Sequence, residues 1–433
     1  MKIAVIGSGI SGLSCAYDLS RAGHEVSLFE ANDYFGGHTH TIDVTLEGQT
    51  YGVDTGFLVF NNKTYPNLVK LFRQLDIATV ATDMSFSVKM PIGQSGKRVM
   101  EWAGANLDTV FAQRRNLFSP AFIRMLRDIL RFNKQTTALA NSQAHKDFQQ
   151  ALGSFLDQHH YSKEFRQWYL LPMAACIWSC PTETMMAFPL SSFVNFCHNH
   201  GLLQVNDRPQ WQTVKGGARQ YVEKILPLIA HTYLNTPVLT VREKSRGVIE
   251  IQTAQGAQNF EHVVLATHSD QSLKLLADST TAERHLLSAV TYQPNRAVLH
   301  TDASFLPVNK KAWSAWNYQS ESGNEARVCV HYLINQLQPL PFQTPVIVTL
   351  NPIEEASPES VIASFDYAHP VFDANAVRAQ TQLANIQGRR NIWFAGAWTG
   401  YGFHEDGLKS GMRVAESILA CADAKQEQRI RAA

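Results

Sequence analysis

The residues whose types and spacing indicate chemistry most clearly lie near the N-terminus of this 433-residue chain. Gly7, Gly9 and Gly12 form a G-x-G-x-x-G motif, and Glu30 follows about twenty residues later. In such a motif the first glycine makes a tight turn, the second lets a pyrophosphate approach the backbone, and the third lets a helix and a strand pack closely. An acidic residue at this distance bonds a ribose hydroxyl group. The spacing therefore predicts a dinucleotide site.

The segments around this motif have the order that such a site requires. Lys2–Ile6 is a short apolar run that predicts a buried strand, Ser11–Ala22 has helical spacing of apolar residues, and Glu25–Phe29 predicts a second strand. The N-terminus of the helix would face the phosphates. We therefore expect an α/β chain with a Rossmann-like domain.

Two further glycine-rich segments indicate FAD rather than NAD. Gly36-Gly37 stands a few residues after Glu30 and allows a second close approach of backbone to cofactor. Near the C-terminus, the strand Ile392–Ala395 enters a glycine-rich loop that opens a helix, whose positive end would stabilise a reduced flavin. The residues expected to contact FAD are Gly7, Ser8, Gly9, Ile10, Ser11, Gly12, Glu30, Ala31, Gly36, Gly37, His38, Thr39, Gly56, Phe57, Leu58, Val238, Ala266, Thr267, Gly396, Ala397, His404, Glu405, Gly407 and Leu408.

The length of the chain and the order of these motifs predict a discontinuous architecture. The FAD-binding domain is expected to comprise residues 1–60, 205–285 and 388–424. Residues 61–204 and 286–387 are expected to form an α+β substrate domain with a mixed sheet and a helical insertion over about 102–200. Residues 425–433 are expected to form a frayed tail.

Composition excludes several classes of protein. A net charge of +1 argues against a nucleic-acid binder that depends on a positive field, and 45% hydrophobic residues provide a large core. No C-x-x-C motif occurs, so neither a zinc site nor a redox dithiol is indicated, and the cysteines are expected to be buried thiols. No metal site is expected. The first strand leaves no room for a signal peptide, and no apolar stretch is long enough to span a bilayer. A cytoplasmic location is expected. The cysteines are Cys15, Cys176, Cys180, Cys197, Cys329 and Cys421.

Histidines are the candidate acid–base groups, because their pKa suits proton transfer near neutral pH. His404 lies on the C-terminal motif, His38 follows the Gly36-Gly37 pair, and His200 lies in a central aromatic segment. Each has a purely structural alternative. Trp178, Trp316, Tyr318 and Tyr332 are candidates for the wall of an apolar substrate tunnel, with core packing as the alternative.

The segment Arg114–Lys134 mixes arginines with apolar residues at helical spacing. A basic amphipathic helix can lie on an anionic membrane, which would place the protein on the inner face of the membrane. An ordinary surface helix with solvated arginines is the alternative. Since only one dinucleotide motif is present, the substrate rather than a nicotinamide is expected to reduce the flavin.

Together these blocks resemble the FAD-dependent amine oxidase superfamily, which includes monoamine and polyamine oxidases, protoporphyrinogen oxidase, and carotenoid and fatty-acyl desaturases. The matching segments are Ile3–Glu30, Gly36-Gly37, Gly216-Gly217, Ala266-Thr267 and Phe394–Gly407. The resemblance covers the flavin domain and implies an FAD-dependent oxidoreductase. No cysteine is placed for a covalent link, so FAD is expected to be non-covalent.

A narrower resemblance is to a bacterial subgroup of NAD/FAD-binding proteins that often accompany cyclopropane-fatty-acid-synthase-like methyltransferases. At least one related enzyme desaturates a methylated fatty acyl chain on the way to furan fatty acids. The resemblance implies a lipid substrate and a methyltransferase partner. The motifs that carry it are Ile177-Trp178-Ser179, Asn199-His200-Gly201, Arg208–Trp211, Ala315–Tyr318, Asn335–Leu337 and Gly396–Gly407.

Two positions depart from the amine oxidase pattern. Arg296 takes the place of a lysine that these oxidases bond through water to flavin N5, and a permanently charged arginine cannot act as a base. Phe403 takes the place of a tyrosine beside the flavin. Three functions remain open: dehydrogenation or desaturation of an apolar chain such as a phospholipid acyl group, amine oxidation with release of peroxide, and a non-catalytic FAD-bound scaffold.

Overall fold

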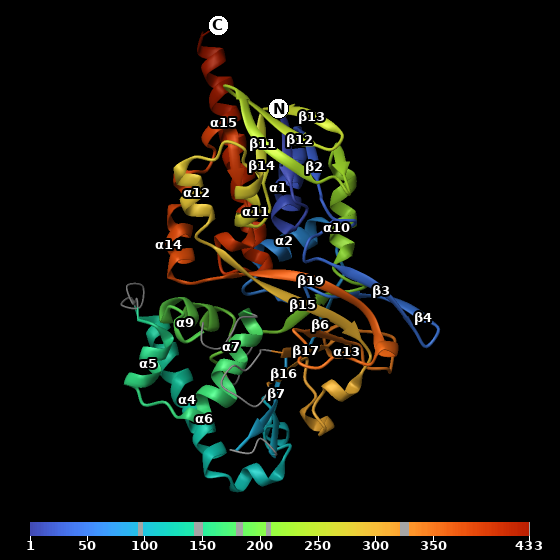
Figure 1. Ribbon diagram of the computed structural model, residues 1–433, viewed down its shortest axis with the longest axis vertical. Helices are drawn as coiled ribbons and strands as arrows, with labels where there is room; N and C mark the ends of the chain where they lie inside the picture. Colours follow the sequence, from blue (N-terminus) through green and yellow to red (C-terminus); the bar gives the residue numbers. More distant parts are fainter. Residues whose placement is uncertain (94–97, 143–149, 179–184, 205–208, 321–328, 433) are drawn as a thin grey trace.

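The computed structural model describes residues 1–93, 98–142, 150–178, 185–204, 209–320 and 329–432. Figure 1 shows an upper part with a sheet flanked by helices and a lower part with a second sheet beside a group of helices. Three residues named above from the sequence, Ser179, Cys180 and Arg208, lie outside the described residues.

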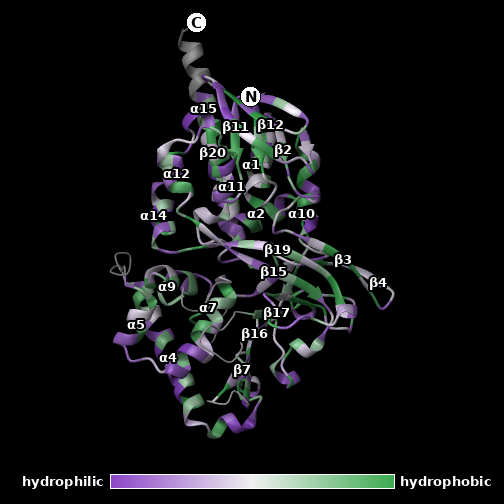
Figure 2. Cartoon of the chain, in the orientation of Figure 1, coloured by the Kyte–Doolittle hydropathy of each residue, from purple (hydrophilic) through white to green (hydrophobic). Residues whose placement is uncertain are grey.

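The upper part is built around a parallel sheet of five strands in the order β10-β2-β1-β14-β20. β1, β2, β14 and β20 are almost entirely buried, as expected for a parallel sheet that is covered on both faces. Figure 2 shows hydrophobic residues gathered inside this part. The strands are β1 (Lys2–Ile6), β2 (Glu25–Phe29), β10 (His231–Tyr233), β14 (His262–Leu265) and β20 (Ile392–Phe394). The sheet is thus assembled from distant segments, as the Rossmann-like prediction required.

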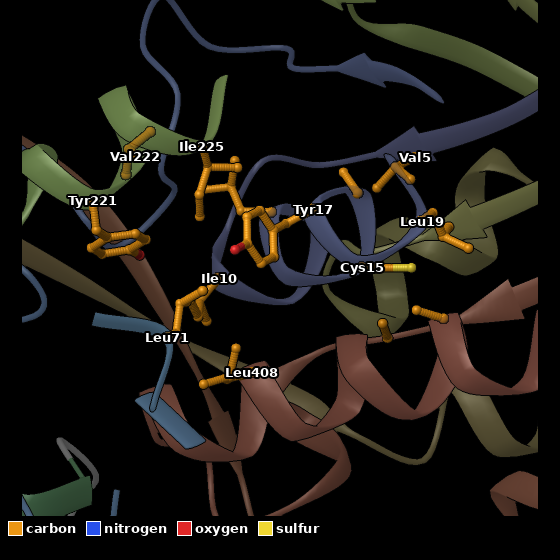
Figure 3. Close-up of a cluster of buried hydrophobic side chains, with 14 of the residues drawn as sticks. Val5, Ile10, Cys15, Tyr17, Leu19, Leu71, Tyr221, Val222, Ile225 and Leu408 are labelled. Atoms are coloured by element: carbon orange, nitrogen blue, oxygen red, sulfur yellow. The ribbon is translucent and has the colours of Figure 1, made fainter. Parts of the chain in front are cut away.

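Two long helices pack against this sheet and against each other. α1 is Ile10–Arg21, and α15 is His404–Ala432, which runs into the segment 425–433 that was expected to form the tail. A Cβ atom at Gly411 would fall on the carbonyl oxygen of Ser11, and one at Gly407 would lie 2.7 Å from Cγ2 of Ile10. The helices can approach so closely only because these positions are glycine. Figure 3 shows Ile10 and Leu408 meeting at this contact.

The lower part contains a mixed sheet of seven strands in the order β19-β15-β18-β17-β16-β7-β8, in which only the β16–β7 pair is parallel. A mixed sheet in this part agrees with the predicted fold class, whereas the exact domain boundaries stay a prediction. The strands are β7 (Phe86–Ile92), β8 (Arg98–Ala103), β15 (Thr291–His300), β16 (Trp316–Gln319), β17 (Cys329–Leu333), β18 (Ile347–Leu350) and β19 (Val361–Val371).

A group of helices lies beside the mixed sheet and encloses an aromatic core. α4 begins at Pro120, where Ser119 caps it by accepting a hydrogen bond from the backbone N–H of Phe122. Its buried face contains Phe122, Met125 and Phe132. The helices are α3 (Leu107–Val110), α4 (Pro120–Asn141), α5 (Leu152–Gln158), α6 (Lys163–Phe165), α7 (Leu171–Trp178) and α9 (Leu190–Asn199). None of the helices in the described ranges is long and apolar enough to cross a membrane.

Further elements lie around the two sheets or between them. They are β3 (Thr41–Leu46), β4 (Gln49–Asp54), β5 (Phe60–Asn61), α2 (Pro66–Gln74), β6 (Thr79–Thr82), β9 (Trp211–Val214), α10 (Arg219–Ile225), β11 (Val238–Ser245), α11 (Ser269–Leu275) and α13 (Ile334–Leu337). Of the cysteines, Cys15, Cys176, Cys197 and Cys329 are buried as predicted, and Cys421 is exposed.

Candidate active site

We use the word cradle for the candidate cofactor site lined by the turn Gly7–Gly12, by Glu30 and by His38. The turn between β1 and α1 forms one wall of this cradle. Gly7 has a φ angle of +97°, and its N–H donates to the carbonyl of Phe29 at 2.8 Å. A Cβ atom at Gly12 would fall on the carbonyl oxygen of Gly7, so this glycine keeps α1 close to the turn. A Cβ atom at Gly9 would meet nothing within 4 Å. Gly9 therefore faces open space, which is where the motif predicts a phosphate.

Glu30 marks the far end of the cradle. Its buried carboxylate accepts hydrogen bonds from the N–H and hydroxyl of Ser8 at 2.9 and 2.5 Å. The hydroxyl of Ser8 also accepts from the N–H of Gly36 at 3.0 Å. The backbone carbonyl of Glu30 accepts from the N–H of Thr236 at 2.8 Å, which brings the start of β11 at Val238 beside Glu30 and Ala31. Three segments with residues that were predicted to contact FAD therefore lie side by side here: the turn at Ser8, the segment from Glu30 to Gly36, and the start of β11.

His38 continues the cradle toward the mixed sheet. Its backbone carbonyl accepts a hydrogen bond from the N–H of Phe57 at 2.8 Å. Position 56 must be glycine, because a Cβ atom there would collide with the same carbonyl. The Nε2 atom of His38 is buried and has no hydrogen-bond partner among the described residues. A buried polar atom without a partner costs free energy unless a bound group pairs with it.

His404 begins α15 and joins the two ends of the predicted site. Its ring stacks on Phe57 with centroids 3.8 Å apart, and its Nε2 shares a hydrogen bond of 2.9 Å with the hydroxyl of Tyr221. That hydroxyl lies 2.5 Å from Oγ1 of Thr39. Burial lowers the pKa of His404 to about 3, so the ring is neutral at neutral pH. Tyr221 on α10 thus connects predicted site residues that are distant in sequence.

A second buried histidine faces His38 from β19. The ring centroids of His38 and His369 are 5.2 Å apart, and Tyr367 stacks on His38 at 5.0 Å. The amide Nδ2 of Asn295 donates to Nδ1 of His369 at 2.8 Å. Burial, and then the neighbouring His268, lower the pKa of His369 to about 4. The pKa of His38 also falls well below its ordinary value, through burial and then through the surrounding histidines.

Arg296 is not brought to this cluster. Side chains alternate between the two faces of β15, so Asn295 is buried and Arg296 is exposed. The guanidinium of Arg296 forms two hydrogen bonds to the carboxylate of Glu355, at 2.7 and 2.9 Å. Asn295 therefore lies on the face of the strand where Arg296 was expected.

The side chain of Glu405 is also used elsewhere. Its carboxylate accepts from the backbone N–H and the amide of Asn67 at 3.1 and 2.7 Å and from the N–H of Leu68 at 3.0 Å. It therefore caps α2 instead of facing the cradle. Ile10, Gly407 and Leu408 belong to the contact between α1 and α15.

The loop before α15 is held between that helix and the end of β14. The N–H of Gly396 donates to the hydroxyl of Ser410 at 3.1 Å, and Ala397 follows directly in the loop. At the end of β14, the N–H of Ala266 donates to the carbonyl of Ile6 at 2.8 Å. The carbonyl of Thr267 accepts from Nε1 of Trp398 at 3.2 Å.

Phe403 lies in an aromatic wall that extends into the helical group. Its ring is 4.7 Å from Phe196, which is 4.7 Å from Trp178. His200 packs on Phe196 at 4.0 Å, and burial lowers its pKa to about 4. Of the other predicted pocket residues, Trp316 and Tyr332 meet at 5.2 Å, and Tyr318 lies in the same apolar cluster.

A hollow of about 610 Å³ opens beside these aromatic residues. Its lining includes Met84, Ser85, Trp211, Leu337 and Gln338. Trp211 lies between this hollow and His200, with ring centroids 6.4 Å apart. A cavity of this size suits a small organic molecule.

Comparison with known proteins decides the family. The family model for flavin-containing amine oxidoreductases matches residues 10–419. The chain belongs to this family. Among solved structures, putrescine oxidase bound to putrescine has a TM-score of 0.68 at 15% identity, covering 97% of this chain and 99% of that chain. The CLA-producing fatty acid isomerase from P. acnes has a TM-score of 0.65 at 14% identity, covering 96% of this chain and 98% of that one.

The sequence relatives include both desaturases and amine oxidases. The 1-hydroxycarotenoid 3,4-desaturase of Flavobacterium sp. is 45% identical over 74 residues, which cover 17% of this chain and 14% of that protein. A probable flavin-containing monoamine oxidase A of Dictyostelium discoideum is 25% identical over 254 residues, which cover 55% of this chain and 51% of that protein. This flavin-containing amine oxidoreductase therefore spans about half the length of the second relative and much less of the first.

The cofactor of the family is FAD, held non-covalently, and the cradle fits it. The open space at Gly9 fits a pyrophosphate, the carboxylate of Glu30 fits the ribose end, and the unpartnered Nε2 of His38 fits a polar group of the cofactor. The residue roles within this cradle stay predictions.

Three residues of the cluster were not predicted from the sequence. Tyr221 lies two residues into the helix after Gly216-Gly217, so the glycine pair marks its segment without marking its side chain. Asn295 and His369 meet only because β15 and β19 pair across the sheet. No local spacing signals such a contact.

Proposed function

We propose that this FAD-dependent oxidoreductase dehydrogenates or desaturates an apolar substrate, with the fatty acyl chain of a phospholipid as the candidate. The supporting observation is the aromatic wall that runs from Phe403 through Phe196 to Trp178. Such a wall contacts an acyl chain over a large apolar area and offers it no charge. When bound, FAD supplies the redox chemistry by accepting a hydride from a substrate carbon at N5.

The charges near the cradle favour a neutral substrate over an amine. The carboxylates of Asp54, Glu405 and Asp406 already accept backbone N–H groups. Burial raises the pKa of Asp54 to about 7 and that of Asp406 to about 6. Because these carboxylates already hold backbone N–H groups, they do not present a free carboxylate to an ammonium group. The fold itself is shared by a putrescine oxidase and a fatty acid isomerase, so it does not choose between the two substrates.

In this proposal the residues of the chain orient the substrate and control protons. The neutral ring of His404, fixed by Phe57 and Tyr221, is available to exchange a proton at Nε2 through the hydroxyl of Tyr221. His38 packs against His369, which Asn295 holds by a hydrogen bond. In this proposal the unpartnered Nε2 atom of His38 is directed at the cofactor. Aromatic side chains exclude water from the reacting carbon.

The resemblance to the lipid-associated subgroup supports two finer parts of the proposal. The substrate chain would carry a methyl or methylene branch, since a cyclopropane-fatty-acid-synthase-like methyltransferase is the proposed partner. The enzyme would then work on lipid at the inner face of the membrane.

The experiment is anaerobic mixing of the FAD-loaded protein with single substrates. We expect phospholipids with methyl-branched acyl chains to bleach the flavin, and mass spectrometry to show a product lighter by two hydrogen atoms. Bleaching by mono- or polyamines, with peroxide released in air, would replace this proposal with amine oxidation. If light reduces the flavin but no substrate does, the scaffold function is favoured.

A further inference from the structure

The end of the molecule farthest from the Rossmann-like sheet exposes large apolar side chains. Phe118 is 87% exposed, Val308 86% and Leu107 77%. They come from segments that are far apart in sequence: the short helix at Arg114–Phe118, the loop before Lys310–Ala312, and α3. We call the exposed set of Val99, Leu107, Leu117, Phe118, Ile123 and Val308 the tip patch. Figure 1 shows β7 and the start of α4 at this end, opposite the C-terminus.

Hydrogen bonds between the segments hold the tip patch in one place. The carboxylate of Glu101 on β8 accepts from the N–H groups of Val308 and Asn309 at 2.8 and 3.0 Å. The amide of Asn309 donates to the carbonyl of Ala112 at 2.8 Å, and Arg115 donates to the carbonyl of Val99 at 2.6 Å. These contacts expose the apolar side chains on fixed backbone rather than on loose loops.

The groups around the tip patch are predominantly basic. Asp108 is ion-paired with both Arg114 and Lys311. In residues 98–118 and 303–312, which carry most of the tip patch, the other acid is Glu101, which is buried and accepts backbone N–H groups. The basic residues of these two segments are Arg98, Arg114, Arg115, Lys310 and Lys311. One exposed acid and five basic residues leave a positive rim around the apolar side chains.

The rest of α4 is less suited to lipid than its start. Arg124 pairs with Glu164 at 2.7 Å, and Arg131 pairs with Asp128 at 2.9 Å. Two of the arginines that made this segment resemble a membrane helix are therefore neutralised within the protein. Of the described residues, the three most exposed large apolar side chains, Phe118, Val308 and Leu107, lie at the end of the molecule in three separate segments, whereas the rest of α4 exposes Leu130 at 61%.

We propose that the tip patch docks the protein on an anionic lipid bilayer, with Phe118, Val308 and Leu107 entering the acyl boundary and the basic rim contacting lipid phosphates. The protruding apolar side chains would fit among the acyl chains of a bilayer, and the surrounding basic residues would meet its anionic headgroups. A folded protein partner would instead be expected to meet a continuous apolar face.

The tip patch also adjoins the apolar cluster that contains the predicted pocket residues. Val110, Phe111 and Leu126 pack from the tip against a core of Trp102 and Tyr318, to which Trp316 and Tyr332 also belong. Lipid bound at the tip patch would thus lie next to the apolar cluster that contains Trp316, Tyr318 and Tyr332. This link rests on the proposed function, whereas the docking itself does not.

The test is flotation of the FAD-loaded protein with vesicles of phosphatidylcholine alone or mixed with phosphatidylglycerol. We expect flotation with the anionic vesicles, loss of it in high salt, and at least a tenfold weaker association for the Phe118→Asp, Val308→Asp double variant. The control is Leu239→Asp, which changes an exposed leucine at 52% exposure on β11 and should float like the wild type.

Three outcomes would overturn the docking proposal. The first is a wild type that does not float with anionic vesicles, and the second is a double variant that floats as well as the wild type. The third is a wild-type dimer in light scattering that the double variant converts to monomer, because the tip patch would then join two copies. Flavin bleaching by detergent-dispersed substrate should be equal in wild type and double variant, so failure of docking is separable from failure of the proposed function.

Discussion

Burial keeps the histidines of the site uncharged. His404 has its pKa lowered to about 3 and His369 to about 4, mainly because burial disfavours the charged rings. A neutral ring can donate at one nitrogen and accept at the other. The rings therefore add no positive charge to the site near neutral pH.

His404 is predicted to act in flavin reduction rather than in FAD binding. His404→Ala should lower the anaerobic rate of flavin reduction by about 10²-fold or more, in the range of acid–base groups, with FAD retained. Tyr221→Phe removes only the hydroxyl that bonds Nε2 and should cost less than about tenfold. Stopped-flow absorbance measures both, and an unchanged rate in His404→Ala would remove this residue from the chemistry.

The same burial predicts a loss of stability in acid. The unfolded chain takes up a proton at His404 near the ordinary value of 6.5, whereas the folded chain does so only near about 3. Stability is therefore complete above pH 6.5 and falls as the pH decreases from 6.5 toward 3, by about 1.4 kcal/mol per pH unit for this group. Denaturant unfolding between pH 7 and pH 5 should show a shallower pH dependence for His404→Phe than for the wild type. Equal slopes would contradict the neutral, buried ring.

Arg296 and Asn295 are adjacent but should differ in their effects. Arg296→Ala removes an exposed ion pair with Glu355, which is worth about 0–1 kcal/mol, and should leave the flavin spectrum unchanged. Asn295→Ala leaves Nδ1 of His369 without its donor, at a cost of about 1–3 kcal/mol, and should shift the flavin spectrum. The opposite result would mean that Arg296, not Asn295, faces the cofactor.

At the scale of elements, the strand–turn–helix at the N-terminus separates cofactor binding from folding. Gly9→Leu fills open space, so the protein should fold and be purified without the yellow colour of FAD. Gly12→Leu collides with the backbone of Gly7 and should reduce the yield of folded protein. Circular dichroism and flavin absorbance separate the two effects. A Gly9→Leu protein with a full complement of FAD would show that the pyrophosphate lies elsewhere.

The elements with strong local patterns were predicted well. The strands at Lys2–Ile6 and Glu25–Phe29 agree with the structure to the residue, because their apolar runs and flanking turns leave few alternatives. Arg296 was expected beside the flavin, but in β15 it is the neighbouring Asn295 that faces inward. Period-two alternation fixes which residues share a face, and only the tertiary partners show which face is inside.

At the scale of the whole molecule, the site is formed by contacts that sequence spacing does not encode. Thr39, Tyr221 and His404 meet although 182 and 183 positions separate them. The tip patch likewise combines Leu107 and Phe118 with Val308. The glycine motifs could be assigned to a cofactor site from the sequence alone. The Thr39–Tyr221–His404 cluster and the tip patch could not, because they depend on how the two sheets and the helical group pack.

The central claim, an apolar substrate oxidised at the cradle of Gly9 and His404, is tested most directly by anaerobic titration of the FAD-loaded protein. We predict that a phospholipid with methyl-branched acyl chains bleaches the flavin stoichiometrically, and that putrescine and monoamines leave the spectrum unchanged. Bleaching by an amine, with no response to any acyl lipid, would contradict this claim.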